Sequence, residues 1–464
     1  MMSLADAARV LETRLAGKDG RFSGVSTDSR TLKAGELFVA LRGERFDGHQ
    51  YLDSARQRGA AGAIVDRSYT GAATLPAIVV EDTRRALGDL ARHWRARFSP
   101  ALVAVAGSNG KTTTKEMLAS VLRVHAGEGH VLATAGNLNN EIGLPLTLLR
   151  LRGEHSHCAI ELGMNHAGEI AYLAGIARPT VALVTNAQRE HFEFMGSVEQ
   201  VAAENGSVYD ALPAQGTAVV NADDAHAAHF RARAGARRVI DFGLDAPAAV
   251  RGGYALKALA SEIRISTPSG EAAATLAIPG VHNVRNALAA AACAHAAGVS
   301  PESIAKGLCA FRPCAGRLQV IRLESGTTLI DDSYNANPDS LRAAIDVLAA
   351  AGGDTVLVLG DMGEVGDQGP DFHLEVGRYA AQRGIGALYA LGELTAHAVA
   401  GFGGGGRHFA SIDGLIEAAR ARAVPGFTLL VKGSRFMRME RVVAALAGGA
   451  AGSAPAGARP GARH

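Results

Sequence analysis

Cysteine is scarce in this chain, and its spacing excludes several classes of protein. The 464 residues include only Cys158, Cys293, Cys309 and Cys314, and none of them forms a Cys-x-x-Cys pair. Zinc ribbons and redox dithiols need closely spaced pairs, and a disulfide framework needs more cysteines in a shorter chain. The sequence therefore predicts four reduced, buried thiols in a cytosolic protein.

Net charge and long apolar runs are also lacking. The 47 Lys and Arg residues nearly balance the 45 Asp and Glu residues, so the net charge is +2. Such a balance gives no sign of binding to nucleic acid or to an acidic membrane. No window of about 20 residues is free of charges and turn formers, and the N-terminus lacks the basic and apolar regions of a signal peptide. We expect a soluble cytoplasmic protein with no nucleic-acid partner and no membrane insertion.

The length of the chain suffices for about three domains of roughly 150 residues each. Hydrophobic residues make up 48% and charged residues 20%, as in ordinary globular proteins. Short apolar runs alternate with helical stretches, which predicts an α/β fold with mainly parallel sheets. Breaks in the pattern predict a small N-terminal α/β domain at residues 1–98, a central P-loop domain at 99–316, a C-terminal Rossmann-like α/β domain at 317–446 and a disordered tail at 447–464.

Several apolar runs are typical of buried strands. They lie at residues 37–41, 63–65 and 77–80, then at 102–106, 158–160, 181–184 and 218–220, and finally at 328–330, 355–359 and 428–431. An Ala-rich run at 286–297 predicts a covering helix. The strands of the central and C-terminal segments end in polar or glycine-rich residues, at the edge where a parallel sheet presents a ligand crevice.

The strongest local signal is a glycine-rich turn after the strand at 102–106. It consists of Gly107, Ser108, Asn109, Gly110, Lys111, Thr112 and Thr113. A strand, such a turn and a helix aim backbone N–H groups at phosphates, while the lysine reaches the outer phosphate oxygens and the first threonine can coordinate Mg²⁺. Val105 stands where a full Walker A sequence has glycine, so this is a shortened P-loop. The alternative is a tight turn without a ligand.

Two residues after neighbouring strands are candidates for metal binding. Glu161 ends the strand at 158–160, and a carboxylate beside a P-loop is well placed to hold Mg²⁺. His191 follows the next strand, but Mg²⁺ prefers oxygen ligands, so by itself this residue is as well explained as a surface or core histidine.

A wider set of motifs resembles the Mur ligases, the ATP-dependent amide ligases of peptidoglycan precursor synthesis. The set comprises GSNGKTT at 107–113, GNLNNEIGLP at 136–145, ELG at 161–163, PGVHNVRN at 279–286, GR at 316–317 and DDSYNANP at 331–338. The stretches at 332–338, 359–364 and 431–435 are most similar to the branch that joins D-alanyl-D-alanine to UDP-N-acetylmuramoyl-tripeptide. The resemblance spans residues from about 20 to about 446 and implies ATP and Mg²⁺ as cofactors.

The resemblance also implies roles for individual residues. Lys111 and Arg317 would act on the phosphates as catalytic residues, and Thr112, Glu161 and His191 would hold the metal. Asn283 would contact adenine and Asp332 the ribose; for Asn283 and Asn286 the alternative is capping of a helix N-terminus. Substrate would be bound by Ser29, Arg30, Asn137, Asn140, Tyr334, Asn335 and Asn337, with the first two on the UDP group. Without its surrounding motif, Arg30 would be read as a solvated cation.

The implied reaction passes the γ-phosphoryl group of ATP to the tripeptide's terminal carboxylate, and the amine of D-alanyl-D-alanine then attacks the acyl phosphate. Positioning and charge neutralisation, without a covalent enzyme intermediate, suit this chemistry. We expect a monomer. The rivals are another Mur-like amino-acid ligase and a P-loop nucleotide switch that ligates nothing.

One departure from the family pattern stands out. Mur ligases typically carry a lysine after the histidine motif that is carbamylated and helps to hold a second Mg²⁺, and here Asn205 occupies that position. The chain has no lysine between Lys115 and Lys257, so no neighbour can substitute. We expect His191, with Glu190 or Glu204 as possible helpers, to serve the second metal without any carbamate.

Overall fold

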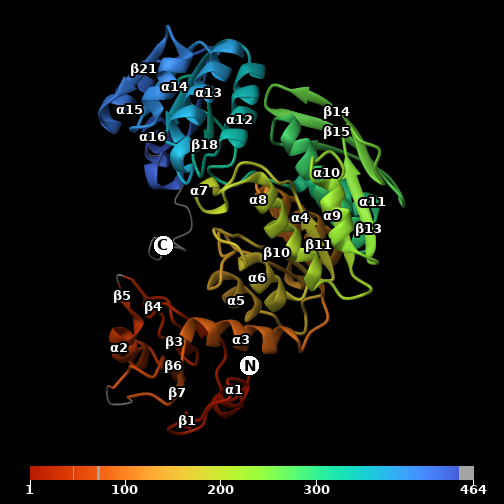
Figure 1. Ribbon diagram of the computed structural model, residues 1–464, viewed down its shortest axis with the longest axis vertical. Helices are drawn as coiled ribbons and strands as arrows, with labels where there is room; N and C mark the ends of the chain where they lie inside the picture. Colours follow the sequence, from red (N-terminus) through yellow and green to blue (C-terminus); the bar gives the residue numbers. More distant parts are fainter. Residues whose placement is uncertain (45, 71–73, 449–464) are drawn as a thin grey trace.

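The computed structural model describes residues 1–44, 46–70 and 74–448. Within them the chain forms three lobes that follow one another along the sequence, from the N-terminal lobe at the bottom of Figure 1 to the C-terminal lobe at its top left. Each lobe contains one mainly parallel sheet, as the sequence predicts. Of the predicted tail, only residues 447 and 448 lie in the described part. The predicted domain limits themselves stay predictions.

The N-terminal lobe is built on a sheet in which β2, β3, β6 and β7 are parallel and β1 is antiparallel, in the order β1-β7-β6-β3-β2. A small antiparallel pair, β4 and β5, stands apart from it. The elements are α1 (Leu4–Val10), β1 (Leu15–Ala16), β2 (Val25–Ser26), β3 (Leu37–Val39), β4 (Arg42–Gly43), β5 (Phe46–Asp47), α2 (Leu52–Gln57), β6 (Gly62–Asp66), β7 (Ala77–Val80) and α3 (Thr83–Arg95). The α3 helix connects this lobe to the central one (Figure 1).

The central lobe holds the largest sheet, with the order β16-β15-β14-β13-β12-β11-β8-β10-β9 among the described residues. Its strands are β8 (Ala101–Ala106), β9 (Val131–Ala133), β10 (His157–Glu161), β11 (Val181–Val184), β12 (Thr217–Asn221), β13 (Arg238–Gly243), β14 (Val250–Lys257), β15 (Ala260–Thr267) and β16 (Gly270–Leu276). Its helices are α4 (Lys111–Ala126), α5 (Gly143–Leu148), α6 (Glu169–Ala177), α7 (Phe192–Met195), α8 (Val198–Gly206), α9 (Ala227–Ala234), α10 (Val281–Ala296) and α11 (Pro301–Ala310).

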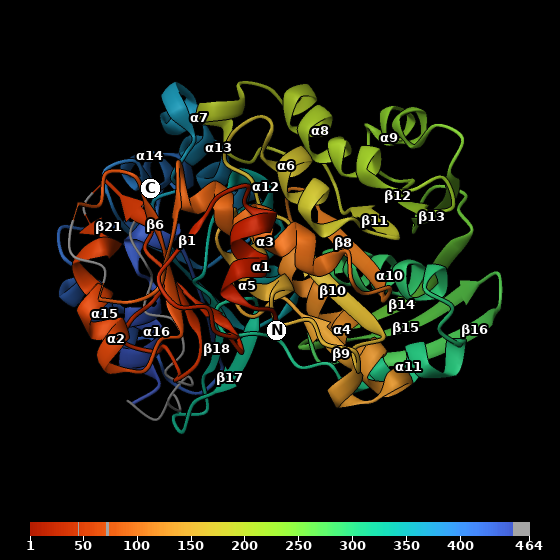
Figure 2. The same cartoon turned by 90° about the horizontal axis from the view of Figure 1, so that it is seen from below.

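Strand β8 shows why this sheet is buried on both faces. Val103 and Val105 point into the core beneath α4 and α10, whereas Leu102, Ala104 and Ala106 belong to the core shared with α3, α5 and α6. Side chains alternate between the faces of a strand, so a run that is apolar at every position needs cover on both sides. Figure 2 shows helices on the two sides of this sheet. The Ala-rich α10 is the covering helix that the sequence predicts.

The antiparallel part of the central sheet is not predicted by the sequence analysis. Strands β14, β15 and β16 pair as an antiparallel meander at one edge. Residues along β15 alternate between buried and more exposed positions, which is typical of a sheet with one face in contact with water. This alternation, followed by the turn at residues 267–270, is the signal that could have revealed the meander.

The C-terminal lobe has a sheet in the order β17-β18-β22-β19-β20-β21, parallel except for β17. Its elements are β17 (Gln319–Arg322), β18 (Thr328–Asp332), α12 (Pro338–Ala350), β19 (Asp354–Gly360), α13 (Gly369–Gln382), β20 (Ala387–Leu391), α14 (Thr395–Phe402), β21 (Gly406–Phe409), α15 (Ile412–Arg420), β22 (Phe427–Lys432) and α16 (Glu440–Leu446). In the register of β18 with β22, Asp332 lies directly opposite Lys432.

The cysteine prediction is partly wrong. All four cysteines are free thiols, and Cys158 and Cys293 are buried, but Cys314 is half-buried and Cys309 is exposed. Cys309 lies in the last turn of α11, whose buried face is formed by Ile304, Gly307 and Leu308. Burial raises the pKa of Cys158 to about 12, so that thiol is unreactive at neutral pH. Among the described residues, no helix has the length and apolar character needed to cross a bilayer.

Candidate active site

The glycine-rich turn lies where the sequence predicts it, between β8 and α4. Gly107 has a φ of 120°, and a Cβ on it would lie 2.2 Å from the Thr185 hydroxyl oxygen. Gly110 has a φ of 83°, and a Cβ there would lie 2.2 Å from Asn286 Oδ1. A side chain at either position would therefore meet both an unfavourable backbone conformation and a neighbouring group.

Two other segments of the central lobe fix the shape of this turn. The Gly107 N–H donates to Asn205 Oδ1 at 2.7 Å. The Ser108 N–H donates to the Asn186 carbonyl at 3.0 Å, and the Asn109 N–H donates to Asn186 Oδ1 at 2.9 Å. The first N–H groups of α4 follow directly, and a helix leaves these groups without intrahelical partners. The turn and the helix N-terminus together form a preorganised site for an anion.

Lys111 lies across the turn. Its ammonium donates to the carbonyls of Gly107 at 2.6 Å and Ser108 at 2.9 Å, and it pairs with Glu190 Oε1 at 2.8 Å. The side chains of Lys111 and Glu190 are only 12% and 10% exposed. Low exposure strengthens such a pair because water screens it poorly. The lysine is thus held at the point where the outer phosphates of a nucleotide on this turn would lie.

Glu161 has the surroundings of a cation ligand. Its Oε1 accepts hydrogen bonds from Asn139 Nδ2 at 2.7 Å and from the Thr112 hydroxyl at 3.2 Å (residue 2% exposed). Its Oε2 is buried and lacks a hydrogen-bond partner among the described residues, as does Oε2 of Glu190. Leaving a buried carboxylate oxygen unpaired is costly, so both oxygens fit a nearby cation.

A metal held here would need ligands from outside the protein. In the described part of the chain, no three His, Cys, Asp or Glu side chains converge as a metal site would require. Mg²⁺ usually keeps several waters and binds one or two carboxylates together with substrate phosphates. Thr112 and Glu161 therefore fit Mg²⁺ with a nucleotide, and their role as ligands stays a prediction.

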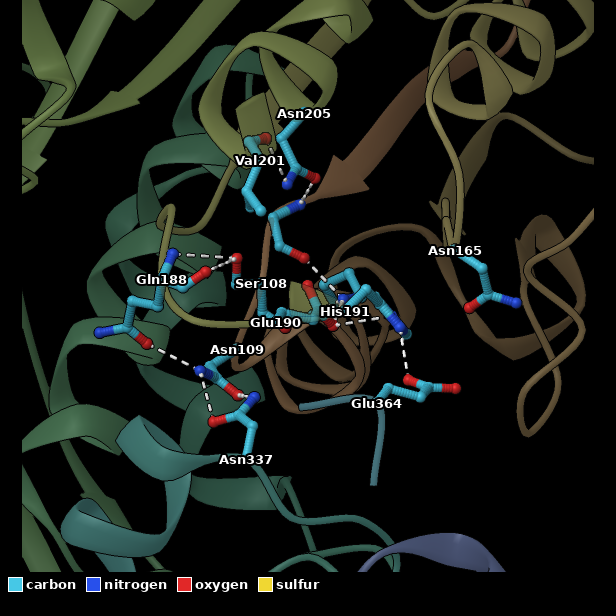
Figure 3. A network of polar contacts seen from close by, with 12 residues as sticks. Ser108, Asn109, Asn165, Gln188, Glu190, His191, Val201, Asn205, Asn337 and Glu364 are labelled. Atoms are coloured by element: carbon cyan, nitrogen blue, oxygen red, sulfur yellow. Dashed lines mark hydrogen bonds and ion pairs between the residues drawn. The ribbon is translucent and has the colours of Figure 1, made fainter. Parts of the chain in front are cut away.

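His191 is placed beside the same site but is already engaged. It has a φ of 49° and precedes α7. Its Nδ1 lies 2.5 Å from Glu364 Oε2, and its Nε2 lies 3.6 Å from Glu190 Oε1 (Figure 3). Burial lowers the pKa of His191, but Glu364 and Glu190 outweigh burial and raise it above the ordinary value. The structure brings His191 to the Lys111 and Glu190 side of the site, and its role as a metal ligand stays a prediction.

The C-terminal lobe contributes to the site through Arg317. Its Nη2 donates to the Thr112 hydroxyl at 3.3 Å, and its guanidinium lies 4.1 Å from the centroid of the Tyr334 ring. Asn337 begins α12 as its N-cap and exchanges two hydrogen bonds with Asn109, at 2.9 and 3.3 Å (Figure 3). The turn of the central lobe thus contacts residues that are more than 200 positions away in the sequence.

Asp332 and Lys432 form an ion pair at the ends of β18 and β22. Lys432 Nζ lies 2.6 Å from Asp332 Oδ2 and also donates to the Asn335 carbonyl at 2.9 Å. The Leu318 N–H donates to Asp332 Oδ1 at 3.1 Å. Burial raises the pKa of Asp332, and the Lys432 ammonium opposes that rise. The pair fixes the loop that carries Tyr334, Asn335 and Asn337.

A cavity of about 1490 Å³ joins these groups. Most of the predicted site residues line it: Ser108, Asn109, Gly110, Lys111, Thr112, Thr113, Asn137, Asn140, Glu161, His191, Asn283, Arg317, Asp332, Tyr334, Asn335 and Asn337. Gly107 belongs to the turn but does not line this cavity. The structure therefore brings together residues from seven separate stretches of the sequence around one space.

Asn283 and Asn286 do not cap α10. The N-cap of this helix is Gly280, and Asn283 Nδ2 donates back to the Pro279 carbonyl at 2.7 Å. Asn286 in turn donates to Asn283 Oδ1 at 3.1 Å. Capping by Asn283 or Asn286 would require α10 to begin directly after one of these residues. The helix begins at Val281, so the capping alternative is wrong. Contact of Asn283 with adenine stays a prediction.

The predicted substrate residues outside the turn divide into two groups. Asn140 Oδ1 accepts from the N–H groups of Ile142 and Gly143, so it organises the start of α5 as well as lining the cavity. Ser29 and Arg30 belong to the N-terminal lobe and are absent from the lining of this cavity. Ser29 is buried, whereas Arg30 is exposed and pairs with Asp28 at 2.6 Å.

Asn205 has a structural partner that the sequence does not reveal. The side chain is 1% exposed, accepts from Gly107 and donates from Nδ2 to the Val201 carbonyl at 3.1 Å (Figure 3). Both carboxylate oxygens of Glu204 accept from N–H groups at the start of α6, those of Gly168 and Ile170. Both oxygens of Glu204 thus serve the start of α6, whereas Glu190 has an oxygen without a hydrogen-bond partner among the described residues, and help from either residue in metal binding stays a prediction.

Several residues of the site were missed by reasoning from sequence. Asn139 binds Glu161, and Gln188 binds Asn109. Arg189 of the central lobe pairs with Glu375, and Glu364 of the C-terminal lobe pairs with His191, so both connect the two lobes. Asn139 lies between the two asparagines that were selected, and no pattern distinguishes the three. Arg189 could have been noticed because it stands between the strand end at 184 and His191, but its partners are invisible in the sequence.

Comparison with known proteins agrees with this geometry. Three family models match the chain: "Mur ligase family, catalytic domain" at residues 21–95, "Mur ligase middle domain" at 105–294 and "Mur ligase, glutamate ligase domain" at 316–435. The UDP-N-acetylmuramoyl-tripeptide–D-alanyl-D-alanine ligase of Escherichia coli K12 is 40% identical over 452 residues, covering 96% of this chain and 98% of that protein. The corresponding ligase of Bacillus subtilis 168 is 34% identical and covers 90% and 92%.

Solved structures show the same relationship. A crystal structure of MurF from Acinetobacter baumannii has a TM-score of 0.88 and 35% identity, and covers 96% of this chain and 98% of that one. MurF ligase from Thermotoga maritima in complex with ADP has a TM-score of 0.80 and 26% identity, and covers 92% and 97%. The chain belongs to the Mur ligase family.

Proposed function

We propose that this protein is an ATP-dependent ligase that joins D-alanyl-D-alanine to UDP-N-acetylmuramoyl-tripeptide in peptidoglycan precursor synthesis. The observation that carries the proposal is the single cavity in which Lys111, Thr112 and Glu161 of the central lobe face Arg317 and Asn337 of the C-terminal lobe. The relatives that match nearly the whole chain bear the name of this reaction.

The chemistry requires activation of a carboxylate. At neutral pH a free carboxylate is a poor acylating agent, because oxide would have to leave. One carboxylate oxygen attacks the γ-phosphorus of ATP, the bond to the β-phosphate oxygen breaks, and an acyl phosphate and ADP form. The amine of D-alanyl-D-alanine then attacks the acyl carbon, loses a proton, and inorganic phosphate leaves as the amide forms.

The protein's own groups serve mainly to position and to neutralise charge. Lys111 and Arg317 converge on the space beside Thr112, so they act on the negative charge of the transferring phosphoryl group. Thr112 and Glu161 would hold Mg²⁺, with Glu190 and His191 close to the same region. When bound, Mg²⁺ supplies further neutralisation of phosphate charge. No side chain is assigned as a covalent nucleophile.

Each lobe has a proposed share of the substrates. Residues 1–98 would bind the UDP group through Ser29 and Arg30, and the central segment 99–316 would bind ATP, with Asn283 at adenine. Asn137 and Asn140 would lie near the substrate carboxylate. Residues 317–446 would bring Asp332 to the ribose and Tyr334, Asn335 and Asn337 to the reacting groups, where exclusion of water protects the acyl phosphate.

We further propose that the protein works in the cytoplasm as a monomer. ATP and a nucleotide-linked sugar are both substrates of that compartment. Sedimentation of the purified protein with and without ATP tests the oligomeric state, and a stable dimer would contradict the proposal.

The test of function is phosphate release with defined pairs of substrates. We expect release that requires ATP, UDP-N-acetylmuramoyl-tripeptide and D-alanyl-D-alanine together, with the corresponding UDP-dipeptide a much poorer substrate. Efficient use of diaminopimelate, lysine or glutamate as the amine would indicate another Mur-like ligase. Nucleotide binding without ligation of any amine would indicate a nucleotide switch.

A further inference from the structure

The loop between β11 and α7 contacts two lobes with alternate side chains. Asn186 Oδ1 accepts from the Asn109 N–H at 2.9 Å, Gln188 Oε1 accepts from Asn109 Nδ2 at 2.8 Å, and Glu190 Oε1 pairs with Lys111 at 2.8 Å. These three residues, at every second position, all face the glycine-rich turn (Figure 3 shows Gln188 and Glu190). One side of the loop is thus committed to the nucleotide site.

Arg189, on the other side of the loop, is bound to the C-terminal lobe. Its Nη2 lies 2.6 Å from Asp339 Oδ1 in α12, and its Nη1 lies 2.7 Å from Glu375 Oε2 in α13. Its backbone N–H also donates to Asp339 Oδ2 at 2.9 Å. The guanidinium lies 5.2 Å from the centroid of the Phe372 ring. Two carboxylates and an aromatic ring of the C-terminal lobe therefore enclose one side chain of the central lobe.

The contact between Arg189 and its two carboxylate partners is partly buried, so water screens it less than it screens a surface ion pair. The side chains of Arg189 and Asp339 are each 22% exposed, and that of Glu375 is 34% exposed. The hydrogen bond from Arg189 holds the pKa of Glu375 below its usual range. Fork-shaped pairing of a guanidinium with a carboxylate fixes direction as well as distance.

A second contact lies next to it. His191 pairs with Glu364, and the Glu193 N–H donates to the Glu364 carbonyl at 3.1 Å. His191 and Glu364 have φ values of 49° and 59°, in the left-handed region that side chains other than glycine rarely adopt. Such conformations persist where the surrounding contacts determine them. The loop is therefore held against the C-terminal lobe at two adjacent points.

We infer that Arg189 is a positioning residue that couples docking of the C-terminal lobe to the placement of Lys111. Asp339 and Glu375 hold Arg189, the loop then holds Glu190, and Glu190 holds the Lys111 ammonium across the turn. When the C-terminal lobe departs, Arg189 loses its partners and the loop loses its fixed position. The phosphoryl-transfer groups are thus aligned when the lobe that excludes water is in place. This inference rests on the proposed function for its kinetic test.

The experiment compares Arg189→Ala with a matched control, Arg342→Ala. Arg342 also pairs with Glu375, at 3.1 Å, and lies over the Tyr379 ring, but these contacts are all within the C-terminal lobe. We expect Arg189→Ala to lower kcat by about tenfold or more while the KM for ATP changes by less than about threefold, because ATP binds the central lobe before docking. Arg342→Ala should stay within about twofold of the wild type.

A double-mutant cycle separates coupling from a general loss of structure. Asp339→Asn should lower kcat in the same direction, and Arg189→Ala combined with Asp339→Asn should be no more than about twofold worse than the more damaging single variant. Arg189→Lys should recover part of the rate, since it keeps the charge but not the fork. If Arg189→Ala does not fold, Asp339→Asn against Arg342→Ala decides the question.

Small-angle X-ray scattering of the full chain provides a readout that needs no activity. The radius of gyration should rise for Arg189→Ala and remain unchanged for Arg342→Ala. Normal kcat and normal dimensions for Arg189→Ala, additive effects with Asp339→Asn, or equal damage from Arg342→Ala would overturn the inference. A wild-type protein without ligase activity would instead refute the proposed function, and the scattering comparison would still test the coupling.

Discussion

The central and C-terminal sheets both present loops at the carboxyl ends of parallel strands, but they build their parts of the site differently. After β8 the site consists of backbone, with two glycines of positive φ and the N-terminus of α4. After β18 it consists of side chains, with Asp332 paired to Lys432 on the neighbouring strand. The same topology thus supplies a backbone turn suited to an anion in one lobe and a set of positioned polar side chains in the other.

This difference predicts how the activity and stability of each region respond to substitution. The turn depends on local conformation, and we propose that one cation, Lys111, carries most of its chemical action. The C-terminal part depends on pairs that the register of the sheet creates, so its groups support one another's stability. Substitutions in the first region should affect the rate far more than the stability, and substitutions in the second should affect both.

The largest effect is expected for Lys111→Ala. If Lys111 neutralises the transferring phosphoryl group, as we propose, removing its ammonium should lower kcat by more than about 10³-fold, and binding of the UDP substrate should stay nearly normal. Lys306→Ala is the control, since that lysine pairs with Glu302 on the exposed face of α11 (side chain 65% exposed). Steady-state kinetics and calorimetric titration measure the two quantities. Wild-type turnover in Lys111→Ala would refute the assignment of the turn.

The next effect concerns stability in the C-terminal lobe. Lys432→Met leaves the Asp332 carboxylate buried without its partner, which should lower the free energy of unfolding by about 3 kcal/mol at pH 7. In urea titrations, lowering the pH from 7 to 5 should restore part of this loss. The folded carboxyl, whose pKa burial raises, binds a proton at a higher pH than the unfolded one, so stability is gained as the pH falls.

A double variant tests whether the loss of stability in Lys432→Met comes from the unpaired Asp332 carboxylate. In Lys432→Met combined with Asp332→Asn, neither charge of this pair remains, so stability should recover and lose the pH dependence that the unpaired Asp332 carboxylate causes. Equal losses in the single and the double variant would show that the ion pair does not determine the stability of this lobe.

A smaller effect is expected at Asn205, which belongs to the central region. Asn205→Leu removes the acceptor of the Gly107 N–H and should cost about 1–3 kcal/mol of unfolding free energy. Asn205→Asp retains an acceptor and should raise the KM for ATP less than Asn205→Leu does. The activity of the wild type should not respond to removal of CO₂ or to added bicarbonate. Strong bicarbonate dependence, or a carbamate on any lysine near the site, would contradict this expectation.

The smallest effect is expected for Arg30→Ala in the N-terminal lobe. Arg30 is exposed and pairs with Asp28, and this pair lowers the pKa of Asp28. The melting temperature should not change measurably, because exposed ion pairs contribute little to stability. The KM for the UDP substrate should rise several-fold while kcat is retained. Arg9→Ala, another exposed arginine with a carboxylate partner, should change neither quantity.

Particular elements show how much of the fold can be predicted from the sequence. The strand, the turn and the helix at 101–126 could be predicted because apolar runs and glycine spacing act locally. Most of the predicted strands appear within one or two residues of their expected limits. The antiparallel meander β14–β16 was not predicted, although the alternation of buried and exposed residues along β15 differs from the continuous apolar runs of the parallel strands. Cys309 was misplaced because burial on α11 depends on which face the helix turns to its neighbours.

By itself, the sequence determined the α/β architecture, the glycine-rich turn and the identity of many residues that line the cavity, because these depend on local periodicity and on motifs of fixed spacing. Only the tertiary structure decided the partners of those residues. The contacts of Arg189 with Asp339, Asn205 with Gly107 and Lys432 with Asp332 join positions about 100 or more residues apart. Such contacts are set by strand register and by the packing of lobes, which no local stretch of sequence specifies.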